Sequence, residues 1–265
     1  MRFETRWGVP MSTRDHAIMG NPCWIDLMTT DVDTARTFYS ELFSWEAGEA
    51  SSEFGGYFMF TRDGAPIAGA MPIEPGGPIP NVWSTYLAVT DVAEAVARAE
   101  AAGATVAAPV VQIADLGAMA VLIDPVGAAI GLWQPIQFQG FSVIDEPRAP
   151  RWFELHARDH DRAVTFYREA FSWDTREMSG ETHLRYTTAN NGDEGFAGLM
   201  DAVGELPEGV PSYWLVYFGV ENVDASLEIV RARGGAVLSP AVDTPFGRMA
   251  GVADPSGAIF TILQS

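Results

Sequence analysis

An internal duplication constrains this 265-residue chain more than any other feature of its sequence. Residues 24–45 read WIDLMTTDVDTARTFYSELFSW, and residues 152–173 read WFELHARDHDRAVTFYREAFSW. Equivalent positions lie 128 residues apart in these segments and 131 residues apart at Trp83 and Trp214, so few insertions separate the copies. Repetition at a nearly constant offset indicates units of one structural kind arranged in series. We therefore expect two domains of the same fold.

Each half of the chain divides again into two similar modules. The Pro/Gly-rich stretches PIEPGGPIP at 72–80 and GELPEGVP at 204–211 interrupt the halves near their middles. On each side of such a stretch, the spacing of apolar residues predicts a strand, then an amphipathic helix, then several strands. The order βαβββ therefore occurs four times. We expect an N-terminal arm at 1–20, a first domain at 21–137 with modules 21–73 and 80–136, a linker at 138–150, and a second domain at 151–265 with modules 151–203 and 211–264.

The composition excludes several classes of chemistry. All 16 basic residues are arginine, so a lysine Schiff base and a phosphate-loop lysine are impossible. The single cysteine, Cys23, leaves no internal disulfide and no cysteine-based zinc site, and we expect it to be a structural thiol. The net charge of −19 is a poor match for nucleic acid or an anionic membrane. Without a long apolar run or a signal core, we expect a soluble cytoplasmic protein, as a monomer or a homodimer.

The four βαβββ modules, the FYxxxF motif on the first helix of each half and the DPxG motif before its last strand resemble the vicinal oxygen chelate superfamily. That group includes glyoxalase I, bleomycin-resistance proteins and extradiol dioxygenases, and the chain resembles its tandem two-domain type from actinomycetes. The resemblance covers roughly residues 20–265. It implies an α+β fold in which each pair of modules forms a curved mixed sheet around a cavity, with helices outside, and catalytic members hold a divalent metal in that cavity.

The resemblance also implies where the family's His, Gln or Glu metal ligands should lie. The equivalent positions here hold residues that do not suit a divalent metal: Trp24, Ser84 and Gly131 in the first half, and Trp152, Leu215 and Thr261 in the second. We therefore expect no resident metal and no cofactor, and neither glyoxalase nor dioxygenase activity of the usual kind. A different metal site stays open, because Glu154 and His156 share a strand face and His183 could come from a neighbouring strand.

Alternation along the strands predicts which side chains face each cavity. Trp24, Asp26, Met28, Tyr86 and Trp133 should line the first, and Trp152, Glu154, His156, His183 and Tyr217 the second. Aromatic walls with one carboxylate suit a flat, largely apolar ligand that carries a polar group. The alternative is that the aromatic residues pack against one another and fill the cavity.

These observations favour a metal-free protein that binds a small aromatic molecule, for sequestration, carriage or help in a natural-product pathway. The first alternative is an enzyme of the lyase, isomerase or hydroxylase kind, in which Glu154, His156 or Asp26 is a general acid or base, since a carboxylate on an apolar wall should have a raised pKa. The second alternative is a glyoxalase or dioxygenase with an atypical metal site. A structural or regulatory partner protein is a third possibility. Arg248 could reach an anionic ligand, although a surface salt bridge is the simpler expectation.

Overall fold

The computed structural model describes residues 14–178 and 185–264 and has the expected α+β architecture. Its first half forms β1 (Pro22–Thr29), α1 (Val32–Phe43), β2 (Glu46–Ala47), β3 (Phe58–Arg62), β4 (Ala65–Pro72), β5 (Val82–Ala88), α2 (Val92–Ala101), β6 (Thr105–Ile113), β7 (Gly117–Ile123) and β8 (Ala129–Pro135). Its second half forms β9 (Pro150–Ala157), α3 (His160–Phe171), β10 (Asp174–Glu177), β11 (Tyr186–Asn191), β12 (Glu194–Asp201), β13 (Tyr213–Gly219), α4 (Val223–Ala232), β14 (Ala236–Val237), β15 (Val242–Thr244), β16 (Gly247–Ala253) and β17 (Ile259–Gln264).

Each half of the chain builds one mixed sheet. The first sheet has the strand order β2-β3-β4-β1-β5-β8-β7-β6, and the second has the order β10-β11-β12-β9-β13-β17-β16-β14. In each sheet the first strands of the two modules pair antiparallel at the centre, so that Trp24 lies opposite Tyr86 and Trp152 opposite Tyr217. The fourth module departs from the pattern, because two short strands, β14 and β15, take the place of the single strand β6 and both pair with β16.

The first helix of each half forms where its sequence supplies both an N-cap and an apolar stripe. The side chains of Asp31 and Asp159 accept hydrogen bonds from the backbone N–H groups of Thr34 and Arg162, which satisfies part of the first turn. Ser44 and Ser172 end the helices in the left-handed conformation. The apolar stripes are buried as predicted, and they include Phe38, Tyr39, Phe43, Phe166, Tyr167 and Phe171.

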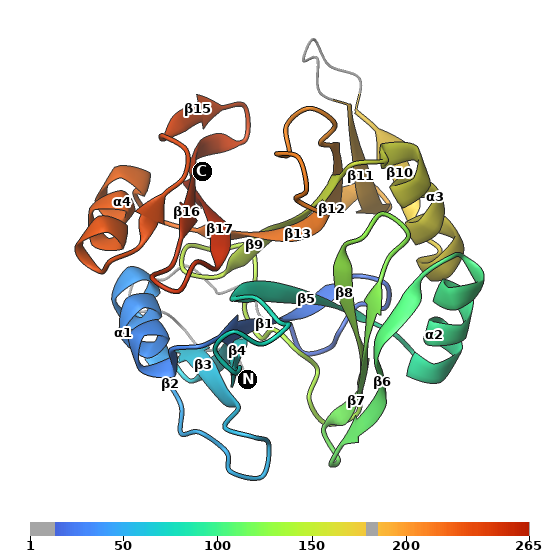
Figure 1. Cartoon of the computed structure of the whole chain (residues 1–265), viewed down its shortest axis with the longest axis horizontal. Coiled ribbons are helices and arrows are strands. Elements are labelled where there is room, and N and C mark those ends of the chain that lie inside the picture. Colours follow the sequence, from blue (N-terminus) through green and yellow to red (C-terminus); the bar gives the residue numbers. More distant parts are fainter. Residues whose placement is uncertain (1–13, 179–184, 265) are drawn as a thin grey trace.

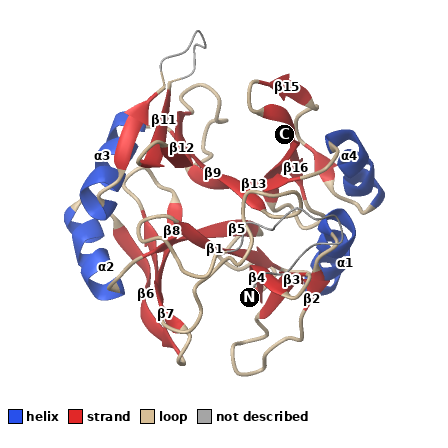
Figure 2. Ribbon diagram, turned by 180° about the vertical axis from the view of Figure 1, so that it is seen from behind, coloured by secondary structure: helices blue, strands red, loops and turns tan. Residues whose placement is uncertain are grey.

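The two halves pack back to back, with β5 against β13, and their concave faces open at opposite ends of the molecule (Figure 1). Helix α1 packs beside α4 on one side and α2 beside α3 on the other, so that each helix pair spans the two halves (Figure 2). Between the sheets lies an aromatic core, in which Trp83 meets Phe218 with ring centroids 5.3 Å apart. No helix in the described ranges is long and apolar enough to cross a membrane.

Candidate functional site

The two concave faces carry equivalent groups of polar and aromatic side chains. We name the face with Trp24, Asp26, Met28, Tyr86 and Trp133 the first concave face, and the face with Trp152, Glu154, His156 and Tyr217 the second. Because successive residues of a strand point to opposite sides, the residues between these positions, such as Ile25 and Leu155, point into the core and are fully buried.

On the first concave face, Asp26 is enclosed by hydrogen-bond donors. Its Oδ1 accepts from the indole Nε1 of Trp24 at 2.9 Å and from the Tyr57 hydroxyl at 2.9 Å, and Tyr86 donates to the same carboxyl group. Gly69, opposite Asp26 on β4, has no side chain, and a Cβ there would overlap both Tyr57 Oη and Asp26 Oδ1. Burial outweighs these donors and raises the pKa of Asp26 to about 6, as expected for a carboxylate on an apolar wall.

The segment that connects β8 to β9, residues 136–149, fills the first concave face with aromatic side chains. The Phe138 ring meets the Trp24 ring edge-on with centroids 4.7 Å apart, and it lies 5.9 Å from the Trp133 ring. The Trp133 indole donates to the Phe138 carbonyl oxygen at 2.9 Å, and Phe141 adds a further ring contact to Trp24. Trp24, Tyr86 and Trp133 are therefore all buried. On this face, the aromatic residues pack against other rings of the same chain.

On the second concave face, Glu154 accepts from two tyrosines and lies against a histidine. Tyr186 Oη donates to Oε2 at 2.6 Å, and Tyr217 Oη donates to Oε1 at 2.7 Å. His156 Nε2 lies 3.0 Å from Oε1, at ion-pair distance but without the angle of a hydrogen bond. Tyr186 also accepts a hydrogen bond from the Trp152 indole at 2.8 Å. Side chains from β9, β11 and β13 thus meet at one carboxylate, and the side chain of Tyr186 reaches it across β12.

The expectation of a raised pKa is wrong for Glu154. Burial alone raises the pKa of this carboxyl group, but His156 and the donors Tyr186 and Tyr217 stabilise the ionised form more strongly, and the net pKa is lowered. The first face has Met28 where the second has His156, so Asp26 has no imidazole beside it. The same position in the two copies therefore holds carboxyl groups whose pKa values shift in opposite directions.

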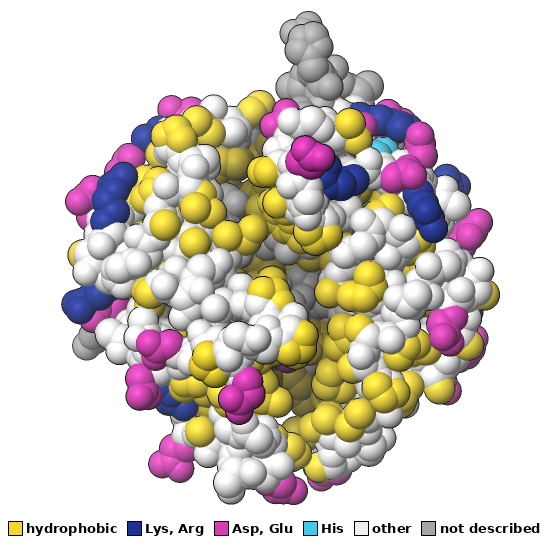
Figure 3. All heavy atoms as spheres, in the orientation of Figure 1, with side chains coloured by type: hydrophobic (Ala, Val, Ile, Leu, Met, Phe, Trp, Pro, Cys, Tyr) yellow, Lys and Arg dark blue, Asp and Glu magenta, His cyan; other side chains and the backbone are white. Residues whose placement is uncertain are grey.

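The second concave face is more open than the first. Trp152, His156, Tyr186, Tyr213 and Tyr217 are all half-buried, and Trp152 has no aromatic ring contact with any described residue. The His156 ring stacks on Tyr213 with centroids 4.9 Å apart and planes inclined by 18°. Trp152 also borders a cavity of about 230 Å³ that reaches the segment before β1. In Figure 3, apolar side chains gather along the middle of the molecule over both halves, while charged side chains lie mostly around the edge.

Sequence reasoning missed Tyr57, Tyr186, Tyr213 and Phe138. The two tyrosines that bind the carboxylates, Tyr57 and Tyr186, lie 129 residues apart, so the repeat offset together with strand alternation was a signal that could have found them. Tyr213 lies on the same face of β13 as Tyr217, at the period-two spacing of a strand. Phe138 carries no such signal, because it lies outside the duplicated strands and its position depends on the path of the connecting segment.

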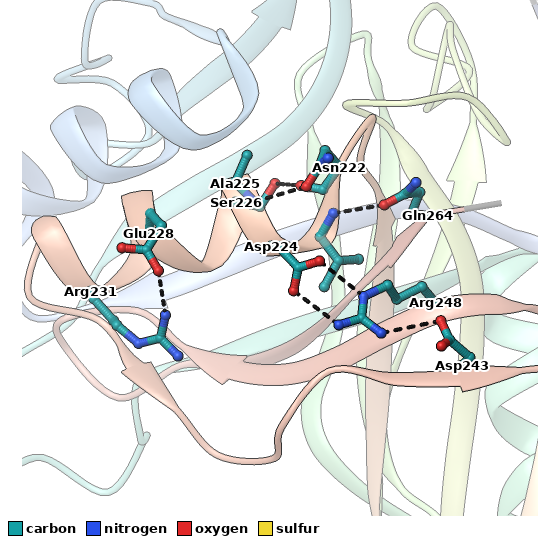
Figure 4. Close-up of polar contacts among 10 residues, drawn as sticks. Asn222, Asp224, Ala225, Ser226, Glu228, Arg231, Asp243, Arg248 and Gln264 are labelled. Carbon is teal, nitrogen blue, oxygen red and sulfur yellow. Dashed lines mark hydrogen bonds and ion pairs between the residues drawn. The ribbon is translucent and has the colours of Figure 1, made fainter.

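Three other residues proposed from the sequence have different outcomes. Cys23 is buried, and burial raises the pKa of its thiol far above the usual range, which suits a structural role. Arg248 is held by Asp224 at 3.2 and 3.0 Å and by Asp243 at 3.2 Å, so it forms a surface ion-pair network rather than facing the second concave face (Figure 4). His183 lies outside the described residues.

The residues present do not fit the family's metal. Trp24 and Trp152 stand at the positions where the family has a metal ligand, and the indole nitrogen of each is already a hydrogen-bond donor, to Asp26 and to Tyr186. Ser84 and Leu215 pair with Asp26 and Glu154, and Gly131 and Thr261 pair with Tyr86 and Tyr217. Within 14–178 and 185–264, no three His, Cys, Asp or Glu side chains come together as a metal site.

Two βαβββ sheets packed back to back, each with a concave face, define a two-domain glyoxalase-like protein. Family models agree: the glyoxalase/bleomycin resistance protein/dioxygenase superfamily matches residues 150–262, and a glyoxalase-like domain matches residues 23–132. The chain belongs to this superfamily, as its motifs indicated.

Relatives of similar length support the assignment. The chain is 36% identical to the putative glyoxylase CFP32 of Mycobacterium tuberculosis over 96% of this chain and 98% of that protein. It is 32% identical to the anthracycline biosynthesis protein DauV of a Streptomyces species, over 92% and 93% of the two chains. The Mn(II)-bound glyoxalase from Novosphingobium aromaticivorans has a similar fold, with a TM-score of 0.64 at 16% identity over 93% of this chain and 82% of that one.

Proposed function

We propose that this protein binds a flat aromatic small molecule on its second concave face, without a resident metal. The observation that carries the proposal is the occupant of the first face. There the chain's own Phe138 ring packs against Trp24, whose indole donates to a carboxylate that is also bound by two tyrosines. The second face has the equivalent indole, carboxylate and tyrosines, but no described ring covers Trp152.

The chemistry of the face suits such a ligand. Half-buried aromatic side chains provide apolar contact area with a defined ring geometry, and a few polar groups fix the orientation of the ligand. The relatives named for anthracycline biosynthesis agree with this proposal, because anthracyclines are fused-ring aromatic compounds. Sequestration, carriage and assistance to a natural-product enzyme would all use the same binding face.

Calorimetric titration with a series of anthraquinones, and with saturated ring compounds of similar size as controls, tests the proposal. We expect the anthraquinones to bind with one site per chain and the saturated compounds to bind much more weakly. Trp152→Leu should weaken binding about fivefold, since a lost aromatic stacking contact is worth roughly 1 kcal/mol.

A matched pair of variants locates the site. Tyr217→Phe removes a hydroxyl that orients Glu154 on the second face, whereas Tyr86→Phe removes its counterpart on the filled first face. Weaker binding in Tyr217→Phe with unchanged binding in Tyr86→Phe is the expected result. The absence of heat or fluorescence change with every aromatic compound would refute the proposal.

A further inference from the structure

One feature that the two halves do not share is an imidazole beside the carboxylate. His156 follows Glu154 by two residues on β9, so both side chains point to the second concave face. The equivalent pair on β1 is Asp26 and Met28. The indole, the carboxylate and the two tyrosines that bind it are repeated on both faces, whereas His156 and its stacking partner Tyr213 stand where the first face has Met28 and Val82.

Glu154 is unsuited to accept a proton itself. Its Oε2 accepts from Tyr186, and its Oε1 accepts from Tyr217 and faces His156 Nε2. These neighbours stabilise the ionised carboxylate, as its lowered pKa reflects, and they leave little room for a ligand to reach either oxygen. The carboxylate is instead placed to stabilise a positive charge on the imidazole.

The His156 ring is held in a defined orientation. It stacks on Tyr213 with planes 18° apart, and its Nε2 approaches Glu154 Oε1 at 3.0 Å. That approach lacks the direction of a hydrogen bond, but an ion pair needs only the distance, so Glu154 is placed to pair with the imidazolium that forms when His156 takes up a proton. The titratable groups around the ring are Glu154 on β9, Tyr186 on β11, and Tyr213 and Tyr217 on β13. No described residue hydrogen-bonds to Nδ1, and the His156 side chain keeps 13% of its surface exposed.

We propose that His156 accepts a proton from an acidic hydroxyl group on the aromatic ligand of the second concave face, an inference that rests on the function proposed above. In this step the ligand O–H bond breaks, its electron pair stays on oxygen, and the proton forms an N–H bond at Nδ1 of His156. The products are a bound phenolate and an imidazolium ion paired with Glu154. The ligand class is therefore hydroxyarenes with an acidic phenol.

A hydroxyanthraquinone and its methyl ether provide the test, because the phenolate absorbs at a longer wavelength than the phenol and the ether has no proton to lose. With the unmodified protein, we expect the hydroxyl compound to show the phenolate spectrum at a pH at least about one unit below the pKa of the free dye. The ether should bind without a spectral change.

His156→Met gives the second face the residue that the first face already accommodates as Met28. It should abolish the spectral change and weaken binding of the hydroxyl compound about tenfold, while the affinity for the ether stays the same. Met28→His adds an imidazole beside Asp26 on the filled face. In the His156→Met background it should restore neither the spectral change nor the affinity for the hydroxyl compound.

The outcomes separate the two proposals. If both compounds bind the unmodified protein without a phenolate spectrum, or if the phenolate spectrum persists in His156→Met, proton transfer to His156 is overturned while aromatic binding stands. If neither compound binds, the function proposed above fails and this inference fails with it.

Discussion

Tyr39 on α1 of the first half donates a hydrogen bond from its hydroxyl to Asp254 Oδ2 of the second half at 3.0 Å. Tyr167 and Asp124 form the reciprocal bond, also at 3.0 Å. Each tyrosine belongs to an FYxxxF motif and each aspartate to a DPxG motif, so the two motifs that mark the repeats in the sequence meet across the boundary between them. The indole of Trp83 donates a hydrogen bond to Tyr39, and the indole of Trp214 donates one to Tyr167, so each bond between the halves is part of a Trp–Tyr–Asp series.

Removing one of these hydroxyl groups should destabilise the whole molecule. Tyr39→Phe leaves the Trp83 N–H without its acceptor and Asp254 without one donor, all in a buried site, so we expect a loss of about 2 kcal/mol in the free energy of unfolding. Urea denaturation measures it. Tyr213→Phe is the matched control, since no described residue hydrogen-bonds to that hydroxyl, and a comparable loss there would contradict the explanation.

Asp26 should make stability depend on pH. Its folded pKa of about 6 lies above the ordinary 3.8, so its favourable contribution is complete below about pH 4 and is lost as the pH rises through 6. Asp26→Asn should therefore gain about 2 to 3 kcal/mol relative to the unmodified protein between pH 4 and pH 7.5, measured by urea denaturation at each pH.

Glu154→Gln should change the free energy of unfolding at neutral pH in the opposite direction from Asp26→Asn. Because the folded pKa of Glu154 is lowered, its stabilisation is present above about pH 4.5 and is lost as the pH falls through the folded value. Glu154→Gln should then be less stable than the unmodified protein at neutral pH, with a difference that shrinks in acid. A difference of the same sign as that of Asp26→Asn would show that His156 and the two tyrosines do not govern this carboxylate.

Phe138→Ala should convert the first concave face into an aromatic binding site. The substitution removes a half-buried ring from between Trp24 and Trp133, and we expect a loss of about 2 kcal/mol in the free energy of unfolding. Indole or benzene should bind the cavity and raise the melting temperature of Phe138→Ala but not that of the unmodified protein. Phe54→Ala, which removes a half-buried ring that has no ring contact with any described residue, serves as the control.

Gly198→Ala should weaken ligand binding on the second concave face, because Gly198 lies in contact with Tyr186 and Trp152. A Cβ at Gly198 would overlap Tyr186 Oη and press on the Trp152 indole, so Tyr186 must move away from Glu154. We expect a fall in affinity for anthraquinones of about tenfold, the effect of losing one hydrogen bond to a charged group. Gly69→Ala makes the same change beneath Tyr57 on the filled face, and titration should find its affinity unchanged.

Much of the architecture follows from patterns along the chain. The duplication, the alternation in β1 and β9, and the aspartates that begin α1 and α3 are local signals, and the structure places the corresponding elements as predicted. The same alternation puts Glu154 and His156 on one side of β9, and in the structure His156 Nε2 lies 3.0 Å from Glu154 Oε1. The fourth module was less predictable, because the break between β14 and β15 depends on how β16 pairs with each of them.

The sequence by itself determined two copies of one sheet, a carboxylate at the same place in each, and indoles where the family holds metal ligands. Only the tertiary structure decided that an aromatic ring covers Trp24 on the first face and that the two carboxyl groups have opposite pKa shifts. Phe138 reaches Trp24 because the connecting segment crosses the first face, and no local pattern encodes that path. The pKa of Asp26 rises while that of Glu154 falls because each depends on the balance between burial and donors from neighbouring strands, and that balance exists only once the strands are paired.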